Sequence, residues 1–155
     1  KDDFRYALAF GDDQFGGPRW DDYLGEGESE LLANGKSVPL ALDRTGASLR
    51  RNFVHVSDVV AAIVAALENP AAERQLFNIA MDEPVNYEQV AAHLARSRGY
   101  EPVPIDTTMF SNWLDNSKAR LLLGWRPIYD LERMIEDAWN YVRGKNEPRL
   151  VWYPG

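Results

Sequence analysis

The sequence predicts an α/β fold in which several helices alternate with short strands. Apolar residues recur at helical spacing in segments that begin at a capping residue and stop at a glycine. Short apolar runs bounded by turn residues lie between these segments, as is typical of strands. The chain has 155 residues, of which 45% are hydrophobic and 12% aromatic, so we expect one domain over residues 1–155 with a buried core.

The composition argues against several classes of protein. The formal net charge of −7 gives no overall attraction to nucleic acid or to an anionic membrane, so we expect neither as a partner. The chain has no cysteine and its two histidines lie far apart in the sequence, so we expect no disulfide and no metal. The longest apolar run, Val59–Leu67, is too short to span a bilayer, and the N-terminus lacks the pattern of a signal peptide. We therefore expect a cytoplasmic protein.

The first elements are a strand, a loop, a helix and a second strand. Arg5–Phe10 is an apolar run that stops at Gly11, which predicts a buried strand, and turn-forming residues follow it over 11–17. Because the chain opens on this strand without a turn or cap, we expect it to be a segment of a longer protein. Glu26–Ala33 has helical composition and stops at Asn34-Gly35, and Val38–Leu42 is a candidate strand.

The stretch RRNFVHVSDVVAAIVAAL, residues 50–67, raises the main functional question. In a strand, Arg51, Phe53 and His55 would share one face, so the Arg51 and His55 side chains could converge on one ligand. Chemistry alone favours structural roles instead, with the arginine paired to a surface carboxylate and the histidine hydrogen-bonded in a core. Asp58 is expected to cap a helix over Val59–Glu68, which Asn69-Pro70 ends.

The remaining elements follow from the same signals. They are a short strand over Leu76–Ala80, a helix to about Arg98 that an Asn86–Gln89 capping box opens and Gly99 ends, an extended piece EPVPID, a helix from Asp115 through Leu123 to Gly124, and a last helix from Asp130 to about Arg143. Within the helix that ends at about Arg98, His93 has polar neighbours, so we expect it to face solvent. The five tryptophans occur singly and are expected to be core and interface residues.

Two short motifs resemble cofactor-binding or catalytic patterns without fitting them. The glycine-rich GDDQFGG loop lacks the Lys-Ser/Thr of a phosphate loop, and its aspartates would repel a phosphate, so we interpret it as a plain or substrate-facing loop. Tyr141 and Lys145 have the Tyr-x-x-x-Lys spacing, but Gly144 is expected to end the helix before Lys145. We interpret this second match as chance.

Taken in order, several motifs resemble the C-terminal half of the extended short-chain dehydrogenase/reductases, also called NAD(P)-dependent epimerase/dehydratases. The similar stretches are RYALAFG at 5–11, RNFVHVSD at 51–58 with its alanine-rich helix, LFNI at 76–79 with the helix after it, and DNSK at 115–118 followed by LGWRP at 123–127. The resemblance covers nearly the whole chain.

This resemblance implies a Rossmann-type α/β fold whose N-terminal nucleotide-binding half is absent here, with residues 1–11 forming a strand of the parent's sheet. In the family that half holds NAD or NADP and supplies the catalytic Tyr-x-x-x-Lys, while the C-terminal half shapes the substrate pocket. Carried over by position, Arg51 contacts a substrate anion and His55, Leu8 and Gly11 are the other substrate-site residues. Tyr6 and Ala7 would border the nicotinamide.

Departures from the family pattern leave the substrate open. Leu8 replaces the family's substrate-binding asparagine, Ala80-Met81-Asp82 replaces its Gly-x-Gly, and residues 102–110 contain no second arginine. A nucleotide sugar and a smaller sugar or other hydroxyl or carbonyl compound therefore fit equally well. We expect the substrate-binding portion of an NAD(P)-dependent epimerase, dehydratase or dehydrogenase, inert alone and able to self-associate. The alternative is a stand-alone or degenerate binding module derived from the same family.

Overall fold

The computed structural model describes residues 25–142. The predicted strand Arg5–Phe10, the loop over 11–17, Lys145 of the Tyr-x-x-x-Lys match, and the candidate site residues Tyr6, Ala7, Leu8 and Gly11 lie outside the described residues. Within the described part the predicted α/β class is confirmed, because helices alternate with short strands along the chain.

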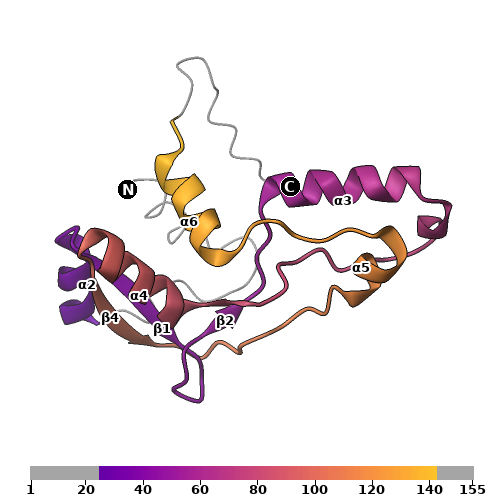
Figure 1. Ribbon diagram of the computed structural model, residues 1–155. Coiled ribbons are helices and arrows are strands. Elements are labelled where there is room, and N and C mark those ends of the chain that lie inside the picture. The colour runs from indigo at the N-terminus through magenta and orange to yellow at the C-terminus, as the bar shows by residue number, and fades with distance from the viewer. Residues whose placement is uncertain (1–24, 143–155) are drawn as a thin grey trace, which may run out of the picture.

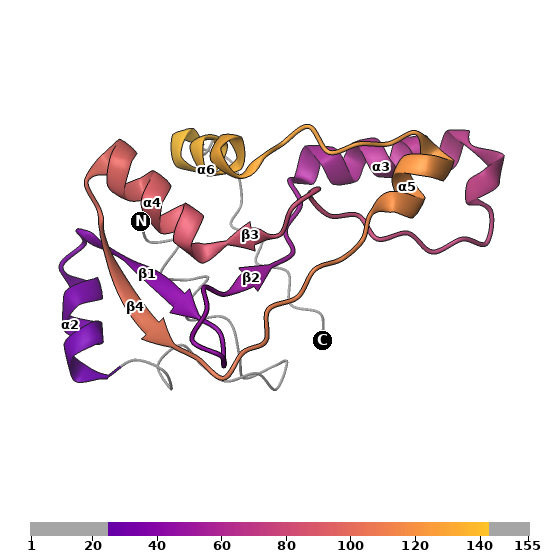
Figure 2. The same ribbon diagram turned by 60° about the horizontal axis from the view of Figure 1, so that its bottom comes forward.

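One end of the molecule is built on a parallel pair of strands, β1 (Ser37–Leu42) and β4 (Glu101–Asp106). Helices α2 (Glu26–Ala33) and α4 (Tyr87–Arg98) lie with these strands in both views (Figure 1, Figure 2). Buried Val38, Ala91 and Leu94 form the core of this group. The EPVPID piece is thus a strand. Its prolines are tolerated because the amides that donate to β1 belong to the alternate residues, such as Glu101 and Thr107.

A second group forms at the other end, around α3 (Val56–Glu68) and α5 (Ser117–Leu123). The short 3-10 helix η2 (Pro70–Ala72) follows α3 directly and contacts both helices. The core here is Ala62, Ala119 and Trp125, with half-buried Phe77, Ile79 and Leu123 packed against it. The described part of the chain therefore has two small cores.

The segment between the two groups contains the short antiparallel pair β2 (Arg50–Arg51) and β3 (Val85–Asn86). The predicted strand through Phe53 and His55 is wrong beyond Arg51, because residues 52–55 have no ladder partner. The predicted strand Leu76–Ala80 is likewise not formed, although the Met81 amide donates to the Phe53 carbonyl at 2.9 Å. Both segments are coil in the described structure, since a strand requires a ladder of such bonds.

The helix caps confirm most of the predicted boundaries. Helix α2 has the predicted bounds, and α4 begins after Asn86, whose side chain accepts from the Glu88 amide, and ends at Gly99 in the left-handed conformation. Helix α5 ends at Gly124 as expected, and the Asp115 carboxylate accepts from the Ser117 amide at its start. The last helix, α6 (Leu131–Asn140), is capped by Asp130 but ends before Arg143, because Tyr141 is extended.

Candidate functional site

Arg51 is the residue that the sequence marks most strongly, and β2 holds it between the two cores. Its side chain is half-buried, and its Nη2 donates to the Met109 Sδ at 3.1 Å. No carboxylate among residues 25–142 lies within ion-pair distance of Arg51. A thioether is a weak acceptor, so this guanidinium keeps most of its capacity to bind an anion.

The loop that carries Met109 is fixed against β2 by side-chain hydrogen bonds. The side-chain amide of Asn52 makes two of these bonds. Its Nδ2 donates to the Asn112 Oδ1 at 2.6 Å, and its Oδ1 accepts from the Leu114 backbone amide at 2.7 Å. The Asn112 amide also donates to the Arg50 carbonyl. At the other side of the loop the Ser111 hydroxyl donates to Asp43 at 2.8 Å. Because these bonds span distant parts of the chain, the surroundings of Arg51 are set by tertiary structure.

Two ionisable groups near β2 have shifted pKa values. Burial raises the pKa of the Tyr87 hydroxyl, and the nearby positive charge of Arg51 partly opposes that rise. Tyr87 therefore stays a neutral phenol at physiological pH. The pKa of Asp43 is lowered to about 2, chiefly by hydrogen bonds from the Thr45 and Ser111 side chains. Asp43 is thus an anion that holds its loop and is not available as a general acid.

His55 occupies a structural position at the start of α3. Its Nδ1 accepts from the Ser57 amide at 3.2 Å, so His55 and not Asp58 is the N-cap, and the helix begins at Val56. The ring stacks on Tyr129 with centroids 3.7 Å apart, and Nε2 lies 3.4 Å from an Asp137 oxygen. Because Nδ1 is an acceptor, the neutral ring carries its proton on Nε2, facing Asp137. The structure gives Arg51 and His55 separate partners and does not bring them together.

Asp58 has a different role from the predicted cap. Its carboxylate is buried and accepts from the backbone amides of Ile128 and Tyr129, both at 3.1 Å, while its carbonyl accepts from the Trp125 indole at 2.9 Å. The predicted cap is wrong because this carboxylate is committed to the segment 125–129. No local pattern in the sequence indicates this pairing, because the two segments lie about 70 residues apart.

The prediction that His93 faces solvent is also wrong. His93 is buried between α4 and α6, with Nε2 at 2.8 Å from Glu136 and Nδ1 at 3.4 Å from Glu132. The described tryptophans differ in exposure. Trp125 is buried, whereas Trp113 and Trp139 are exposed. Tyr141 lies beyond the end of α6, so within the described residues it is not part of a helical Tyr-x-x-x-Lys pair.

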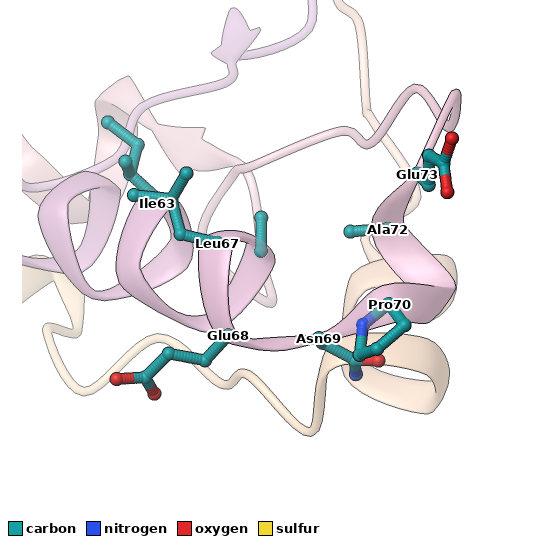
Figure 3. Close-up of a pocket in the computed structure, with 8 residues that line it drawn as sticks. Ile63, Leu67, Glu68, Asn69, Pro70, Ala72 and Glu73 are labelled. Carbon is teal, nitrogen blue, oxygen red and sulfur yellow. The ribbon is translucent and has the colours of Figure 1, made fainter.

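The described surface is hollowed near β2 and near α3. A cavity of about 420 Å³ borders β2 and is lined by polar side chains of Asp43, Ser48, Arg50, Asn86, Glu88 and Ser111. A larger hollow of about 490 Å³ lies where α3 meets η2 (Figure 3). Its lining includes Ile63, Leu67 and Pro70 and offers little chemistry, so we give it no role. Residues 25–142 contain no group of His, Asp and Glu that could hold a metal ion, and none of their helices is long and apolar enough to cross a membrane.

Comparisons with known proteins show a similarity to the same family. Residues 29–80 match the NAD dependent epimerase/dehydratase family. The chain is 30% identical over 141 residues to UDP-glucose 4-epimerase of Mycolicibacterium smegmatis, covering 84% of this chain and 44% of the relative. It is 26% identical over 123 residues to the chloroplast stem-loop binding protein of 41 kDa b of Arabidopsis thaliana, covering 69% of this chain and 32% of that protein.

Solved structures show the same relationship. A short-chain dehydrogenase/reductase superfamily protein from Agrobacterium tumefaciens with bound NAD has a TM-score of 0.62 and 27% identity, covering 71% of this chain and 35% of that one. UDP-glucose 4-epimerase of Thermotoga maritima with UDP-glucose has a TM-score of 0.50 and 28% identity, covering 76% of this chain and 39% of that one. The chain therefore spans well under half of these proteins.

In fold and sequence the chain is similar to the NAD-dependent epimerases and dehydratases, over residues 29–80 for the family model and over less than half of the relatives' length. More particularly, the resemblance to the extended short-chain dehydrogenase/reductases is confirmed, over part of those proteins' length.

Proposed function

We propose that this chain is the substrate-binding portion of an NAD(P)-dependent epimerase, dehydratase or dehydrogenase that acts on a sugar or nucleotide sugar. The observation that carries the proposal is Arg51, a half-buried arginine hydrogen-bonded to the Met109 thioether with no described carboxylate partner. A planar guanidinium suits the oxygens of a phosphate or carboxylate, which would displace the weak Met109 contact. Tyr87, whose hydroxyl lies within the influence of the Arg51 charge, would lie near such a ligand.

The N-terminus of α2 does not fit a dinucleotide. A pyrophosphate site needs a helix N-terminus with close backbone approach and no negative charge, whereas α2 opens with Glu26 and Glu28 in its first turn. We therefore assign the cofactor, NAD or NADP, to a nucleotide-binding half of a longer protein. By itself this chain would bind an anion and leave the substrate chemically unchanged.

Isothermal titration with UDP-glucose, UDP and glucose tests the assignment of Arg51. Arg51→Met should weaken binding of the two phosphate-bearing compounds by about 10- to 100-fold, since a hydrogen bond to a charged group contributes about 1.5–3 kcal/mol. Arg50→Met is the matched control, because Arg50 is the exposed neighbour in the same strand and should matter less. Equal losses in the two variants would contradict a specific role for Arg51.

The enzymatic part of the proposal is tested on the longer protein obtained from the upstream coding sequence. It should convert a sugar or nucleotide sugar in an NAD- or NADP-dependent manner, and the present chain added alone should not. Turnover by the present chain at enzymatic rates would contradict the assignment of the cofactor and of catalysis to the nucleotide-binding half.

A binding module derived from the same family is the second candidate, favoured by the relative named as a stem-loop binding protein. The net charge of −7 argues against RNA as its ligand. Titrating an RNA hairpin in low salt separates the two candidates. Hairpin binding without any response to nucleotide sugars would favour the module.

A further inference from the structure

The polar cavity of about 420 Å³ beside β2 is distinct from the surroundings of Arg51. Arg50 lines this cavity and Arg51 does not. Because consecutive residues of a strand point to opposite faces, the two arginines of β2 serve different sites. The volume lies within the range of about 300–1,000 Å³ that small-molecule sites occupy. The cavity is therefore large enough for a small ligand of its own.

The walls of this cavity come from three segments that are distant in the sequence, and hydrogen bonds fix them to one another. The Ser48 hydroxyl accepts from the Glu88 amide at 2.9 Å, which ties the turn after β1 to the start of α4. The Ser111 hydroxyl accepts from the Arg50 amide at 3.0 Å and donates to the Asp43 Oδ2 at 2.8 Å. The backbone around the cavity is thus ordered without a ligand, which lowers the entropy cost of binding one.

Arg50 and Glu88 bring opposite charges to the cavity without forming an ion pair. Both side chains are exposed, and neither pairs with the other or with any further residue of 25–142. A guanidinium only donates hydrogen bonds, and a carboxylate only accepts them. Each of these two groups therefore keeps its full capacity for a ligand.

Asp43 adds a second carboxylate, which is half-buried. Its Oδ1 accepts from the backbone amide and the hydroxyl of Thr45, and its Oδ2 accepts from Ser111. A carboxylate oxygen has two lone pairs, so Oδ2 can accept one more hydrogen bond. Asp43 is an anion at neutral pH, because these bonds lower its pKa to about 2.

The charges of the lining residues select the ligand class. An anion alone would be repelled by Asp43 and Glu88, and a cation alone would be repelled by Arg50. A molecule with both an ammonium and a carboxylate group can form a charge-assisted hydrogen bond with each of the three side chains. The smallest such molecules are free α-amino acids, in which both groups are attached to one carbon atom.

The uncharged part of the lining favours a polar amino-acid side chain. The Asn86 Oδ1 accepts from the Ser48 hydroxyl and the Glu88 amide, while its Nδ2 has no acceptor among residues 25–142. Ser48, Asn86 and Ser111 complete the polar wall. An amide or hydroxyl on the ligand would accept from the Asn86 Nδ2.

We propose that this cavity binds a free polar α-amino acid, with its carboxylate on Arg50 and its ammonium group between Asp43 and Glu88. The inference goes beyond the proposed function and does not depend on it, because Arg51 does not line the cavity.

An NMR titration of the whole ¹⁵N-labelled chain with L-glutamine tests the proposal. Two truncated probes are titrated beside it, glutaramate without the ammonium group and 4-aminobutanamide without the carboxylate. L-Glutamine should shift the backbone amide resonances of Ser48, Glu88 and Ser111. Its Kd should be at least tenfold lower than that of either probe, since each loses one hydrogen bond between charged groups.

Four variants at exposed positions complete the test, and none of them changes a buried residue. Arg50→Met and Glu88→Gln should each weaken the binding of L-glutamine about tenfold or more. The matched controls are Arg126→Met and Glu101→Gln, at residues that do not line the cavity, and they should keep the wild-type affinity. Glu101 lies at the opposite end of the β1–β4 pair from Asp43.

Three results would overturn the proposal. They are unmoved amide resonances at Ser48, Glu88 and Ser111, binding of L-glutamine no tighter than that of a truncated probe, and wild-type affinity in either Arg50→Met or Glu88→Gln.

Discussion

The indole N–H of buried Trp125 donates a 2.9 Å hydrogen bond to the backbone carbonyl of Asp58. The Asp58 carboxylate in turn accepts from the amides of Ile128 and Tyr129. The carbonyl and both carboxylate oxygens of Asp58 thus accept from one short segment, residues 125–129. This segment runs from the core of Ala62 and Ala119 to the start of α6. Asp58, which lies in α3, therefore ties this helix to the segment that leads into α6.

The first prediction concerns this buried aspartate. Asp58→Asn should lower the free energy of unfolding by about 2 kcal/mol, because it removes charge-assisted hydrogen bonds and turns an N–H₂ toward backbone donors. Urea unfolding followed by circular dichroism measures the loss. Asp130→Asn changes an exposed cap of α6, where asparagine serves equally well, and should be nearly neutral. Equal stability of the two variants would contradict the role assigned to Asp58.

The second prediction concerns acid stability. The pKa of Glu136 is lowered from 4.5 to about 2 in the folded chain, first by the Arg98 hydrogen bonds and then by His93. Its stabilising effect is therefore present above about pH 4.5 and is lost as the pH falls toward 2. Glu136→Gln should be less stable than the wild type at pH 6 and should lose less stability between pH 4.5 and 2.5. Parallel acid-unfolding curves for the two proteins would refute it.

The third prediction uses two glycines of opposite conformation. Gly124 has a φ of +66° and open space where a Cβ would lie, so Gly124→Ala should cost about 1 kcal/mol through backbone strain alone. Gly27 lies within α2, also with open space around it, so Gly27→Ala should stabilise by about 0.5–1 kcal/mol. Thermal melts of both variants should therefore shift in opposite directions.

The fourth prediction concerns Asn52, a positioning residue for the candidate site. Asn52→Ala removes both bonds to the loop that carries Met109 while Arg51 itself is unchanged. We expect the affinity for UDP to fall several-fold by isothermal titration, because the loop then orders less of the Arg51 surroundings. Asn140→Ala, at an exposed position near the end of α6, should leave the affinity as it was.

The fifth prediction concerns the outer face of α3. Five apolar residues on this helix are exposed, with Leu67 at 82% and Val56 at 68%, and they are Val56, Val60, Ile63, Val64 and Leu67. Exposed apolar faces of this kind favour association. The chain should sediment as a concentration-dependent mixture, and Val60→Glu with Leu67→Glu should shift it toward the monomer. A monomer over a wide concentration range would count against this expectation.

Local signals were sufficient for most helices and failed where distant partners decide. The caps of α2 and α4 were predictable because each involves residues next to the helix, as in the 2.9 Å bond from the Glu88 amide to Asn86. The start of α3 was not predictable, because Asp58 binds a segment about 70 residues away and His55 is the N-cap instead. His93 was misplaced for the same reason, since its carboxylate partners lie on α6.

The strands and the candidate site show the same limit. Residues 52–55 and 76–80 carry strand-like patterns, yet a pattern specifies a strand only where another strand completes the ladder. For Arg51, the sequence indicated the residue, but neither the Met109 contact nor the Asn52 bridge could be read from residue order. Tyr6, Ala7, Leu8 and Gly11 remain predictions, as do the substrate roles of Arg51 and His55.

Contacts between residues far apart in the sequence, among them that of Arg51, also bear on the order of folding. The bond from Arg51 to Met109 closes 58 residues of chain and that from Tyr129 to Asp58 closes 71, whereas the caps of α4 join near neighbours. Closing long loops costs entropy that only later contacts return. The helices should therefore form early and the environment of Arg51 last, so that competence to bind an anion appears in the final kinetic phase of refolding.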